Sequence, residues 1–376
     1  MKQQERVPLM DALRGLSCLG IVLYHVRVDL WIGWWRIRSY PEEYSQFAKA
    51  MAWLSIPTPF LGFAILLFFL ISGFCIHYPN TMESAKPKWR EYFIRRFWRI
   101  YPPYLAALAL TAGISYLCHV QWGGSTWDPE RILRVATLSQ NYPPDAGQFL
   151  SNPSLWTIPL EVEFYLLYPI AFCLFTRLRS LVLGLFAGGL CVWTVFLGKQ
   201  GISWPSFTAL FFWPVWLLGA WLAQLYRNNR LDSLPLRLIF PIGALSLVLA
   251  LTSRILNWDS WLQYFIWTAF YLCLLVFVLI KHDLLARLPI QGVLALLTWL
   301  GKISFSLYLV HFPLFKLLGF LHLSLFGEKP ANFLLSLAFV PLVIIVAWLF
   351  HKTVEMPSHA LSRSLSKSSP VSIAAK

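Results

Sequence analysis

Apolar runs of about 20 residues recur along the whole chain, and short polar or basic segments separate them. As a helix, a run of this length spans the hydrocarbon core of a bilayer. The runs are continuous, whereas strands of a membrane β-barrel alternate apolar and polar residues. The pattern predicts an all-α, polytopic integral membrane protein with about ten transmembrane helices, at residues 11–31, 56–78, 100–120, 154–176, 181–198, 207–225, 238–253, 261–280, 303–323 and 332–350.

An even number of spans places both ends of the chain on one side of the membrane. Most of the 31 Lys and Arg residues fall in segments that share this side, and basic loops stay in the cytoplasm. The basic segment that most strongly favours this orientation is residues 86–104, "KPKWREYFIRRFWRIYPPY". We therefore expect both termini to be cytoplasmic, with one membrane domain over residues 1–353 and a short cytoplasmic tail over residues 354–376.

Composition narrows the class of protein. Hydrophobic residues make up 58% of the 376-residue chain and charged residues 13%, about half the charged share of a soluble domain. The net charge of +14 is scattered over short loops and forms no basic face on a soluble domain, so we expect no nucleic-acid partner. The six cysteines lie in or beside apolar runs without paired ligand spacing, so we interpret them as small buried side chains and expect no metal.

The first span carries an arginine, Arg14, and a histidine, His25, within an otherwise apolar stretch. Arg14 and His25 are eleven positions apart, which on a helix is three turns plus about 20°, so they share one face and lie about 16 Å apart. Ionisable side chains at this depth normally face a polar cavity or a partner. The alternative is an arginine that reaches the headgroups and a histidine bonded to a neighbouring helix.

The fourth span carries two carboxylates, Glu161 and Glu163, within "SLWTIPLEVEFYLLYP". Glu161 lies about 10 Å below the outer surface, a depth similar to that of His25. A pair of these two side chains would hold the imidazole in one tautomer and tune it as a general base for a hydroxyl. The alternative is a structural pair that joins two helices. Glu163 points to a different side, where helix contacts, a cavity edge and chemistry are all open.

The ninth span places Ser304, Tyr308 and His311 along one face, because spacings of four and three residues correspond to single turns. His311 lies about 12 Å above the inner boundary, somewhat below His25. These side chains either line a polar cavity or form hydrogen bonds between helices.

The basic segment before the third span contains Arg95, Arg96 and Arg99. Such clusters usually fix topology or contact anionic lipid. Arginine also offers planar, bidentate donors to phosphoryl oxygens. Arg95 and Arg99 are one helical turn apart, which would allow them to share one phosphate group of a nucleotide-bearing cofactor.

Together these stretches resemble acyltransferase family 3, the bacterial membrane O-acyltransferases that modify sugars of cell-envelope and secreted polysaccharides. Arg14 and His25, within "DALRGLSCLGIVLYHV", match the family pattern of Arg, ten residues and His. Other matching stretches are "FFLISGF" with Ser72 and Gly73, "RRFWRIYPPY", "LWTIPLEVEFYLLYP" with Glu161, "ISFSLYLVHFPL" and "VEMP". The resemblance covers nearly the whole chain.

The fourth-span stretch departs from the family at two positions. Pro159 stands where members commonly carry a serine, and Glu163 stands where they carry a glutamine. We also expect no appended esterase-like domain of the kind that some relatives carry. We therefore expect the membrane domain itself, or a separate protein, to complete the transfer.

The resemblance implies a reaction. The donor would be acyl-coenzyme A, usually carrying acetyl and sometimes succinyl, and the acceptor a hydroxyl of a polysaccharide such as lipopolysaccharide or exopolysaccharide, at the bacterial inner (plasma) membrane. His25, supported by Glu161, would activate the hydroxyl or first receive the acyl group. The other candidates would bind the coenzyme or the acceptor: Arg14, Arg95, Arg96, Arg99, Ser72, Ser304, Tyr308 and His311.

Two other classes of protein fit parts of the pattern. A transporter or flippase for a lipid-linked sugar would also carry intramembrane His, Glu and Arg, although the chain shows no inverted repeat or matched pair of broken spans. A non-catalytic assembly subunit would keep the fold without the chemistry. Aromatic-rich outward segments at residues 31–44 and 122–142 either stack on sugar rings or mark the membrane interface.

Overall fold

The computed structural model describes residues 8–81, 87–124, 126–143, 149–177, 180–231, 233–287 and 289–367. Within these ranges the chain forms helices and no strand, which confirms the all-α prediction. Nine of the described helices are long and apolar enough to cross a membrane, and one bent pair, Gln46–Leu61 with Ala64–Asn80, brings the number to ten. The chain is a multi-pass membrane protein.

The long helices follow the predicted spans in order. They are α1 (Pro8–His25), α5 (Ala64–His77), α6 (Trp89–Trp122), α8 (Thr157–Arg177), α9 (Ser180–Lys199), α10 (Ala209–Arg227), α11 (Leu236–Ile255), α12 (Ser260–Ile280), α14 (Gln291–Phe326) and α16 (Val340–Phe350). The shorter helices between and after them are α2 (Trp34–Ser39), α3 (Gln46–Ala52), α4 (Thr58–Leu61), α7 (Pro129–Ala136), α13 (His282–Arg287), α15 (Phe333–Ala338) and α17 (Met356–Lys367). Two π-helical segments, Val26–Leu30 and His351–Glu355, directly follow α1 and α16.

Several helices extend beyond the predicted spans. The segment predicted as a basic loop forms the first turns of α6, which begins at Trp89. Helix α14 likewise extends past both ends of the predicted span at 303–323. Hydropathy marks only the apolar part of a helix, whereas backbone hydrogen bonding continues through its polar ends.

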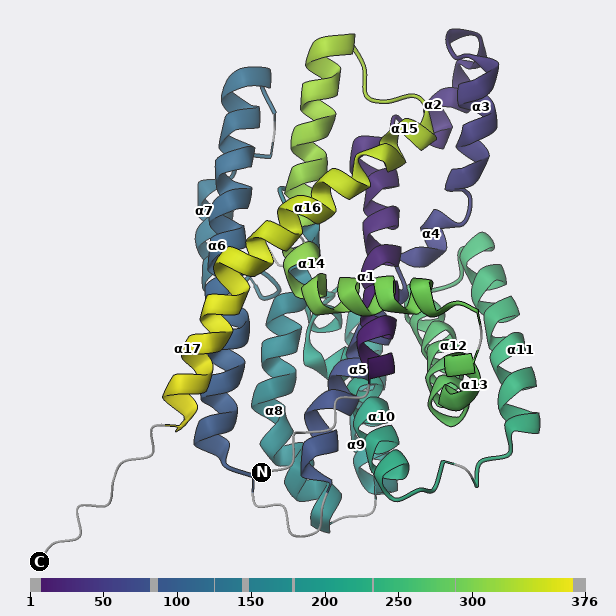
Figure 1. Cartoon of the computed structure of the whole chain (residues 1–376), viewed down its shortest axis with the longest axis vertical. Helices are drawn as coiled ribbons and strands as arrows, with labels where there is room; N and C mark the ends of the chain where they lie inside the picture. Colours follow the sequence, from purple (N-terminus) through teal and green to yellow (C-terminus); the bar gives the residue numbers. More distant parts are fainter. Residues whose placement is uncertain are drawn as a thin grey trace, which may run out of the picture.

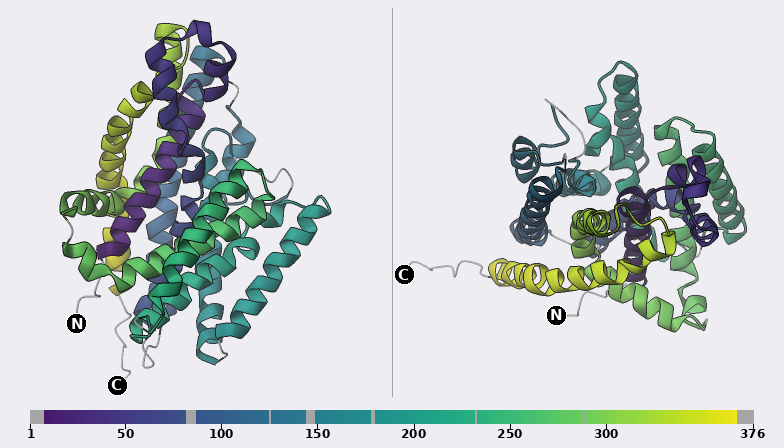
Figure 2. Two further views of the ribbon diagram at one scale, coloured as in Figure 1. Left: turned by 90° about the vertical axis from the view of Figure 1, so that its right-hand side faces the viewer. Right: turned by 90° about the horizontal axis from the view of Figure 1, so that it is seen from above.

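Helices α4, α5 and α14 pack against α1. Helix α14 first crosses the bundle and then turns to run beside α1 (Figure 1). Helix α5 packs against α10, and α11 packs against α12. Seen from above, α16 and α17 run along one side of the molecule (Figure 2). The start of α1 and the end of α17 lie toward the same end (Figure 1), as an even number of crossings requires.

Glycines bring two of these helix pairs into backbone contact. A β-carbon on Gly15 or Gly301 would lie within 2.0 Å of a carbonyl oxygen of the opposing helix, in the α1–α14 pair. A β-carbon on Gly73 or Gly219 would do the same between α5 and α10. Small residues at such positions let transmembrane helices approach closely, which is how helices associate where water supplies no driving force.

Gly301→Ala is expected to destabilise the protein, because its β-carbon would lie 1.8 Å from the carbonyl oxygen of Asp11. Overpacking of this kind typically costs about 1–3 kcal/mol. The measurement is the thermal unfolding midpoint of the purified protein in detergent. Gly188→Ala in α9 is the matched control, since its β-carbon would meet no atom within 4 Å. Equal losses in both variants would contradict the packing argument.

The chain continues as a helix beyond the predicted domain boundary at residue 353. Helix α17 packs against α6, where Ser358 donates to the carbonyl of Trp98 and Arg95 Nε donates to Ser366 Oγ at 3.4 Å. The first part of the predicted tail is therefore a packed helix, because its polar residues hydrogen-bond to α6. Residues 368–376 of that tail lie outside the described residues.

Candidate active site

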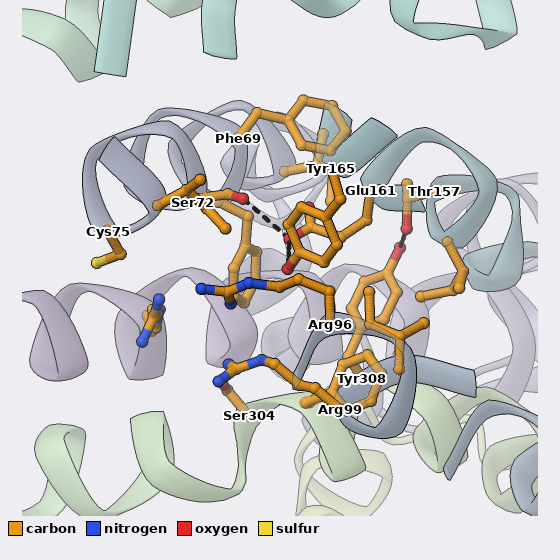
Figure 3. A pocket seen from close by; sticks show the side chains of 17 residues that line it. Phe69, Ser72, Cys75, Arg96, Arg99, Thr157, Glu161, Tyr165, Ser304 and Tyr308 are labelled. Carbon is orange, nitrogen blue, oxygen red and sulfur yellow. Dashed lines mark hydrogen bonds between the residues drawn. The ribbon is translucent and has the colours of Figure 1, made fainter. Parts of the chain in front are cut away.

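A cavity of about 790 Å³ lies among α1, α5, α6, α8 and α14, and we call it the arginine cavity. Arg14 of α1 and Arg96 and Arg99 of α6 line it. The side chains of Arg96 and Arg99 extend into it side by side (Figure 3). Among its described lining residues, Glu161 of α8 is the single carboxylate, and most of the others are apolar or aromatic. The cavity therefore carries an excess of positive charge.

The three arginines have few partners of their own. Arg14 Nη1 lies 3.3 Å from Asp11 Oδ1. The Arg96 guanidinium lies 5.2 and 5.5 Å from the centres of two tyrosine rings, and its buried Nε donates no hydrogen bond to any described residue. Arg99 makes no hydrogen bond or ion pair within the part of the chain that the structure describes. Partly buried cations with few partners gain from an opposite charge, so this cavity favours an anionic ligand.

Arg95 does not belong to this group, which corrects the prediction that it shares a phosphate with Arg99. Its guanidinium binds Glu91 Oε2 at 3.2 Å, and its side chain is 49% exposed on the side of α6 that faces α17. The spacing of one turn is as predicted, but the cavity lies on the face of α6 that carries Arg96 and Arg99. Which face of a helix meets the cavity depends on its neighbours.

Glu161 lies in the arginine cavity and is held by hydrogen bonds. Its Oε1 accepts from Ser72 Oγ at 2.9 Å and from Tyr165 Oη at 2.5 Å (Figure 3). Trp216 Nε1 lies 3.2 Å from Ser72 Oγ and extends this network to α10. No hydrogen bond or ion pair joins Glu161 to His25 among the described residues. The predicted pair is therefore wrong, because similar depth in the membrane does not bring two helix faces together.

A second cavity, of about 1140 Å³, contains His25, and we call it the histidine cavity. Its walls come from α1, α12, α14 and the ends of neighbouring helices, and they include the aromatic side chains of Tyr24, Phe63, Trp156 and Phe312. The ring of Phe312 lies edge-on to the imidazole of His25, with centroids 5.2 Å apart. His25 ends α1, and the π-helical segment Val26–Leu30 follows it directly. Such segments occur frequently at functional sites.

His25 pairs with a second histidine. His311 Nε2 of α14 lies 2.9 Å from His25 Nδ1, and His311 Nδ1 lies 2.9 Å from the carbonyl oxygen of Leu307. A carbonyl only accepts, so His311 Nδ1 carries a proton, and in the neutral ring Nε2 is then the acceptor. His25 Nδ1 must therefore donate to it. This leaves His25 Nε2 with a free lone pair and no hydrogen-bond partner among the described residues.

The two cavities adjoin each other, because Ile65 and Tyr308 line both. Tyr308 Oη donates to the carbonyl of Ser154 at 2.7 Å. It accepts from Thr157 Oγ1 at 2.7 Å (Figure 3). Its ring is thereby held in place as a shared wall. The positively charged cavity and the histidine-bearing cavity meet at this wall.

The remaining residues singled out from the sequence either line the arginine cavity or have a local structural role. Ser304 lines the arginine cavity and donates to the carbonyl of Gly301 at 2.8 Å. Ser72 lines the same cavity, whereas its neighbour Gly73 packs against α10. Pro159 lies in the first turn of α8, where the missing N–H removes no intrahelical bond.

Glu163 lies outside both cavities. Its two oxygens accept from Tyr142 Oη at 2.8 Å and from the backbone N–H of Ala209 at 2.5 Å, so it joins the segment before α8 to the start of α10. Burial raises the pKa of the Tyr142 phenol, and the neighbouring carboxylate of Glu163 raises it further. Of the roles left open for Glu163, the structure supports helix contacts.

Sequence reasoning missed several residues of the site. Tyr165 is one turn after Glu161 on α8, so helical spacing alone would have suggested its hydrogen bond. Trp216 and Arg254, which line or support the cavities from α10 and α11, carry no such local signal. No group of three or more His, Cys, Asp or Glu side chains among the described residues is arranged to hold a metal ion.

The fold and the paired cavities define a multi-pass membrane protein with a cationic cavity beside a histidine-bearing one. A family model described as "Acyltransferase domain" matches residues 7–352, so the chain belongs to this family, acyltransferase family 3. The chain is an O-acyltransferase of the membrane.

Known relatives are distant in sequence. The chain is 26% identical to "Acyltransferase MdmB" of Streptomyces mycarofaciens over 98% of this chain and 95% of that protein. It is 23% identical to a protein named as a candidate O-acetyltransferase in Staphylococcus aureus (strain COL), over 95% of this chain and 58% of that longer protein. A candidate acetyltransferase of Acidianus two-tailed virus is 25% identical over 84% of this chain and 86% of its own length. No solved structure matches the chain.

Proposed function

We propose that this protein transfers an acetyl group from acetyl-coenzyme A to a hydroxyl of a carbohydrate, as an O-acetyltransferase of cell-envelope or secreted polysaccharides in the bacterial inner membrane. The observation that carries the proposal is the shared wall, Ile65 and Tyr308, between the arginine cavity and the histidine cavity. A phosphate-bearing donor in one cavity and a hydroxyl in the other would meet there.

The arginine cavity suits the donor. Coenzyme A carries its phosphates and its thioester at opposite ends of a long, mostly uncharged arm. Arg96 and Arg99 have donors to spare for phosphoryl oxygens, which guanidinium groups bind in a bidentate manner. Arg14 extends the positive charge along α1, and the apolar wall accommodates the arm. The thioester would then reach the wall formed by Tyr308.

His25 supplies the chemistry in this scheme. Its Nε2 takes the proton of the acceptor hydroxyl as the hydroxyl oxygen attacks the thioester carbonyl, and the carbon–sulfur bond breaks. The proton on Nε2 then neutralises the departing coenzyme A thiolate. His311 holds the tautomer through its hydrogen bond to Nδ1. Tyr308 shapes the passage only, since its hydroxyl is already committed to Ser154 and Thr157.

The direction of transfer follows from the proposed orientation of the chain. Arg14 lies nearer the N-terminal end of α1 than His25. With both termini in the cytoplasm, the arginine cavity faces the cytoplasmic donor and the histidine cavity faces the opposite side. One enzyme would thus acetylate an acceptor outside the cytoplasm from a donor inside it.

The test is acetyl transfer by the purified protein in lipid nanodiscs, with radiolabelled acetyl-coenzyme A and a panel of oligosaccharides. We expect label on an oligosaccharide and release of one coenzyme A per acetyl group. Two results together would contradict the proposed enzyme and favour a carrier. They are that the label stays on coenzyme A with every carbohydrate, and that a labelled lipid-linked sugar crosses the membrane of vesicles that contain the protein.

His311→Leu is expected to lower kcat by about 10- to 100-fold, because His25 would no longer be held in its reactive tautomer. The KM for acetyl-coenzyme A should stay within about twofold, since His311 does not line the arginine cavity. His311→Gln should recover part of the rate, because its amide oxygen can accept from His25 Nδ1. A parallel rise in KM, or equal rates for the Leu and Gln variants, would leave His311 with a purely structural role.

A further inference from the structure

The histidine cavity contains one arginine and no carboxylate among its described lining residues. This arginine, Arg254, lies in the last turn of α11 and is partly buried. Its guanidinium makes no hydrogen bond or ion pair with any residue that the structure describes. Asp259 is the nearest acid in sequence, but its carboxylate accepts from Trp261 Nε1 at 3.1 Å and does not pair with Arg254. A positive charge therefore lines this cavity without a counter-charge.

The surroundings of Arg254 strengthen its effect. The cavity walls combine aromatic side chains, Tyr24, Phe63, Trp156, Tyr264 and Phe312 among them, with polar ones such as Ser260 and Gln263. Because Arg254 is partly buried, its charge is screened less by water and attracts an opposite charge more strongly than a fully exposed arginine would. The same rings present flat apolar faces that suit the carbon–hydrogen faces of a sugar ring.

We propose that the acceptor carries a fixed negative charge, a carboxylate or a phosphate, and that Arg254 binds this group while the reacting hydroxyl lies at His25. The inference rests on the proposed function and names the class of acceptor, an anionic saccharide. A neutral sugar of the same shape leaves the guanidinium without a partner. The cost of that unpaired charge is the source of discrimination.

This anion site is separate from the donor site. The donor phosphates belong to the arginine cavity, whose lining does not include Arg254. Among the described lining residues, the histidine cavity shares with it only Ile65 and Tyr308, neither of which carries a charge. Acceptor recognition by Arg254 can therefore be removed without changing the charges that face the donor.

The experiment measures the equilibrium binding of three fluorescent trisaccharides to the purified protein in nanodiscs of zwitterionic lipid, without donor. The first probe is built from glucose, the second from glucuronic acid and the third from glucose 6-phosphate, so they differ in carrying no charge, a carboxylate or a phosphate. We expect one or both anionic probes to bind about tenfold or more tightly than the glucose probe. The tighter of the two distinguishes a carboxylate from a phosphate.

Variants assign the preference to one side chain. Arg254→Gln is expected to remove the preference for the anionic probes, and Arg254→Lys to retain part of it. Arg237→Gln is the matched control, because Arg237 is exposed in the first turn of the same helix and lines neither cavity. It should retain the full preference.

Three results would overturn the inference. They are equal affinity for the three probes, a preference that persists in Arg254→Gln, and an Arg254-dependent contact with phosphatidylglycerol nanodiscs in the absence of any preference among the trisaccharides. The last result would assign Arg254 to a lipid headgroup. Binding needs no transfer, so a preference without acetylation contradicts the proposed function alone, and acetylation without a preference contradicts this inference alone.

Discussion

His25→Ala is expected to lower kcat for acetyl transfer by about a thousandfold, because the variant loses the general base that receives the hydroxyl proton. His311 is not among the described residues that line either cavity, so its Nε2, which loses its hydrogen-bond partner in this variant, is not placed to contact the acceptor directly. The measurement is the rate of label transfer from acetyl-coenzyme A to oligosaccharide at matched protein concentration. His322→Ala is the control, because His322 is a half-buried histidine on the same helix as His311 and lines neither cavity.

Whether the His25→Ala variant still binds coenzyme A can be measured without acetyl transfer. Cys75 lines the arginine cavity, whereas Cys18, Cys118 and Cys191 are buried. In a background without Cys173 and Cys273, alkylation of Cys75 reports on access to the cavity. Protection of Cys75 by coenzyme A should be the same with and without His25. A variant that keeps more than about a tenth of the wild-type rate would refute the role of His25 as general base.

Replacing Arg96 and Arg99 together with Gln is expected to raise the KM for acetyl-coenzyme A by about a hundredfold. Hydrogen bonds to charged groups contribute about 1.5–3 kcal/mol each, and about 1.4 kcal/mol corresponds to tenfold in affinity. Steady-state kinetics with acetyl-coenzyme A measure the effect. Acetyl-pantetheine, which lacks the phosphates, should show the same KM with the wild type and the double variant.

Arg95→Gln is the matched control for this double variant. It removes a charge from the same turn of α6, but on the exposed face that binds Glu91. We expect its KM to change by no more than about twofold. If Arg95→Gln were as damaging as the double variant, the cluster would act through topology or anionic lipid and not through a phosphate in the cavity.

Helical periodicity was a sound guide within a single helix. It placed Arg14 and His25 on one face of α1, and the structure has them lining two adjoining cavities. The same reasoning put Ser304, Tyr308 and His311 along one side of α14, which is the side that meets these cavities and His25. Spacing along one helix is set by backbone geometry, so local sequence is sufficient to predict it.

The predicted contact between side chains of two different helices was wrong. Equal depth suggested that His25 would pair with Glu161, but the partner is His311, and Glu161 is bound by Ser72 and Tyr165. The depth of a side chain in the membrane is only one of the three coordinates that fix its position. The rotation of each helix about its axis and the choice of neighbours set the other two, and these depend on the packing of whole helix surfaces.

The sequence by itself determined the class of protein and the order of its spans, because the thickness of a bilayer imposes the length and polarity of every crossing helix. It also supplied the motifs of an acyltransferase family that the comparisons support. Only the tertiary structure decided which arginines face the donor cavity, which residue holds His25 in its tautomer, and that Arg254 stands unpaired in the other cavity. Those features depend on close contacts between helices far apart in the chain, such as the one at Gly15 and Gly301, and hydropathy and spacing carry no information about them.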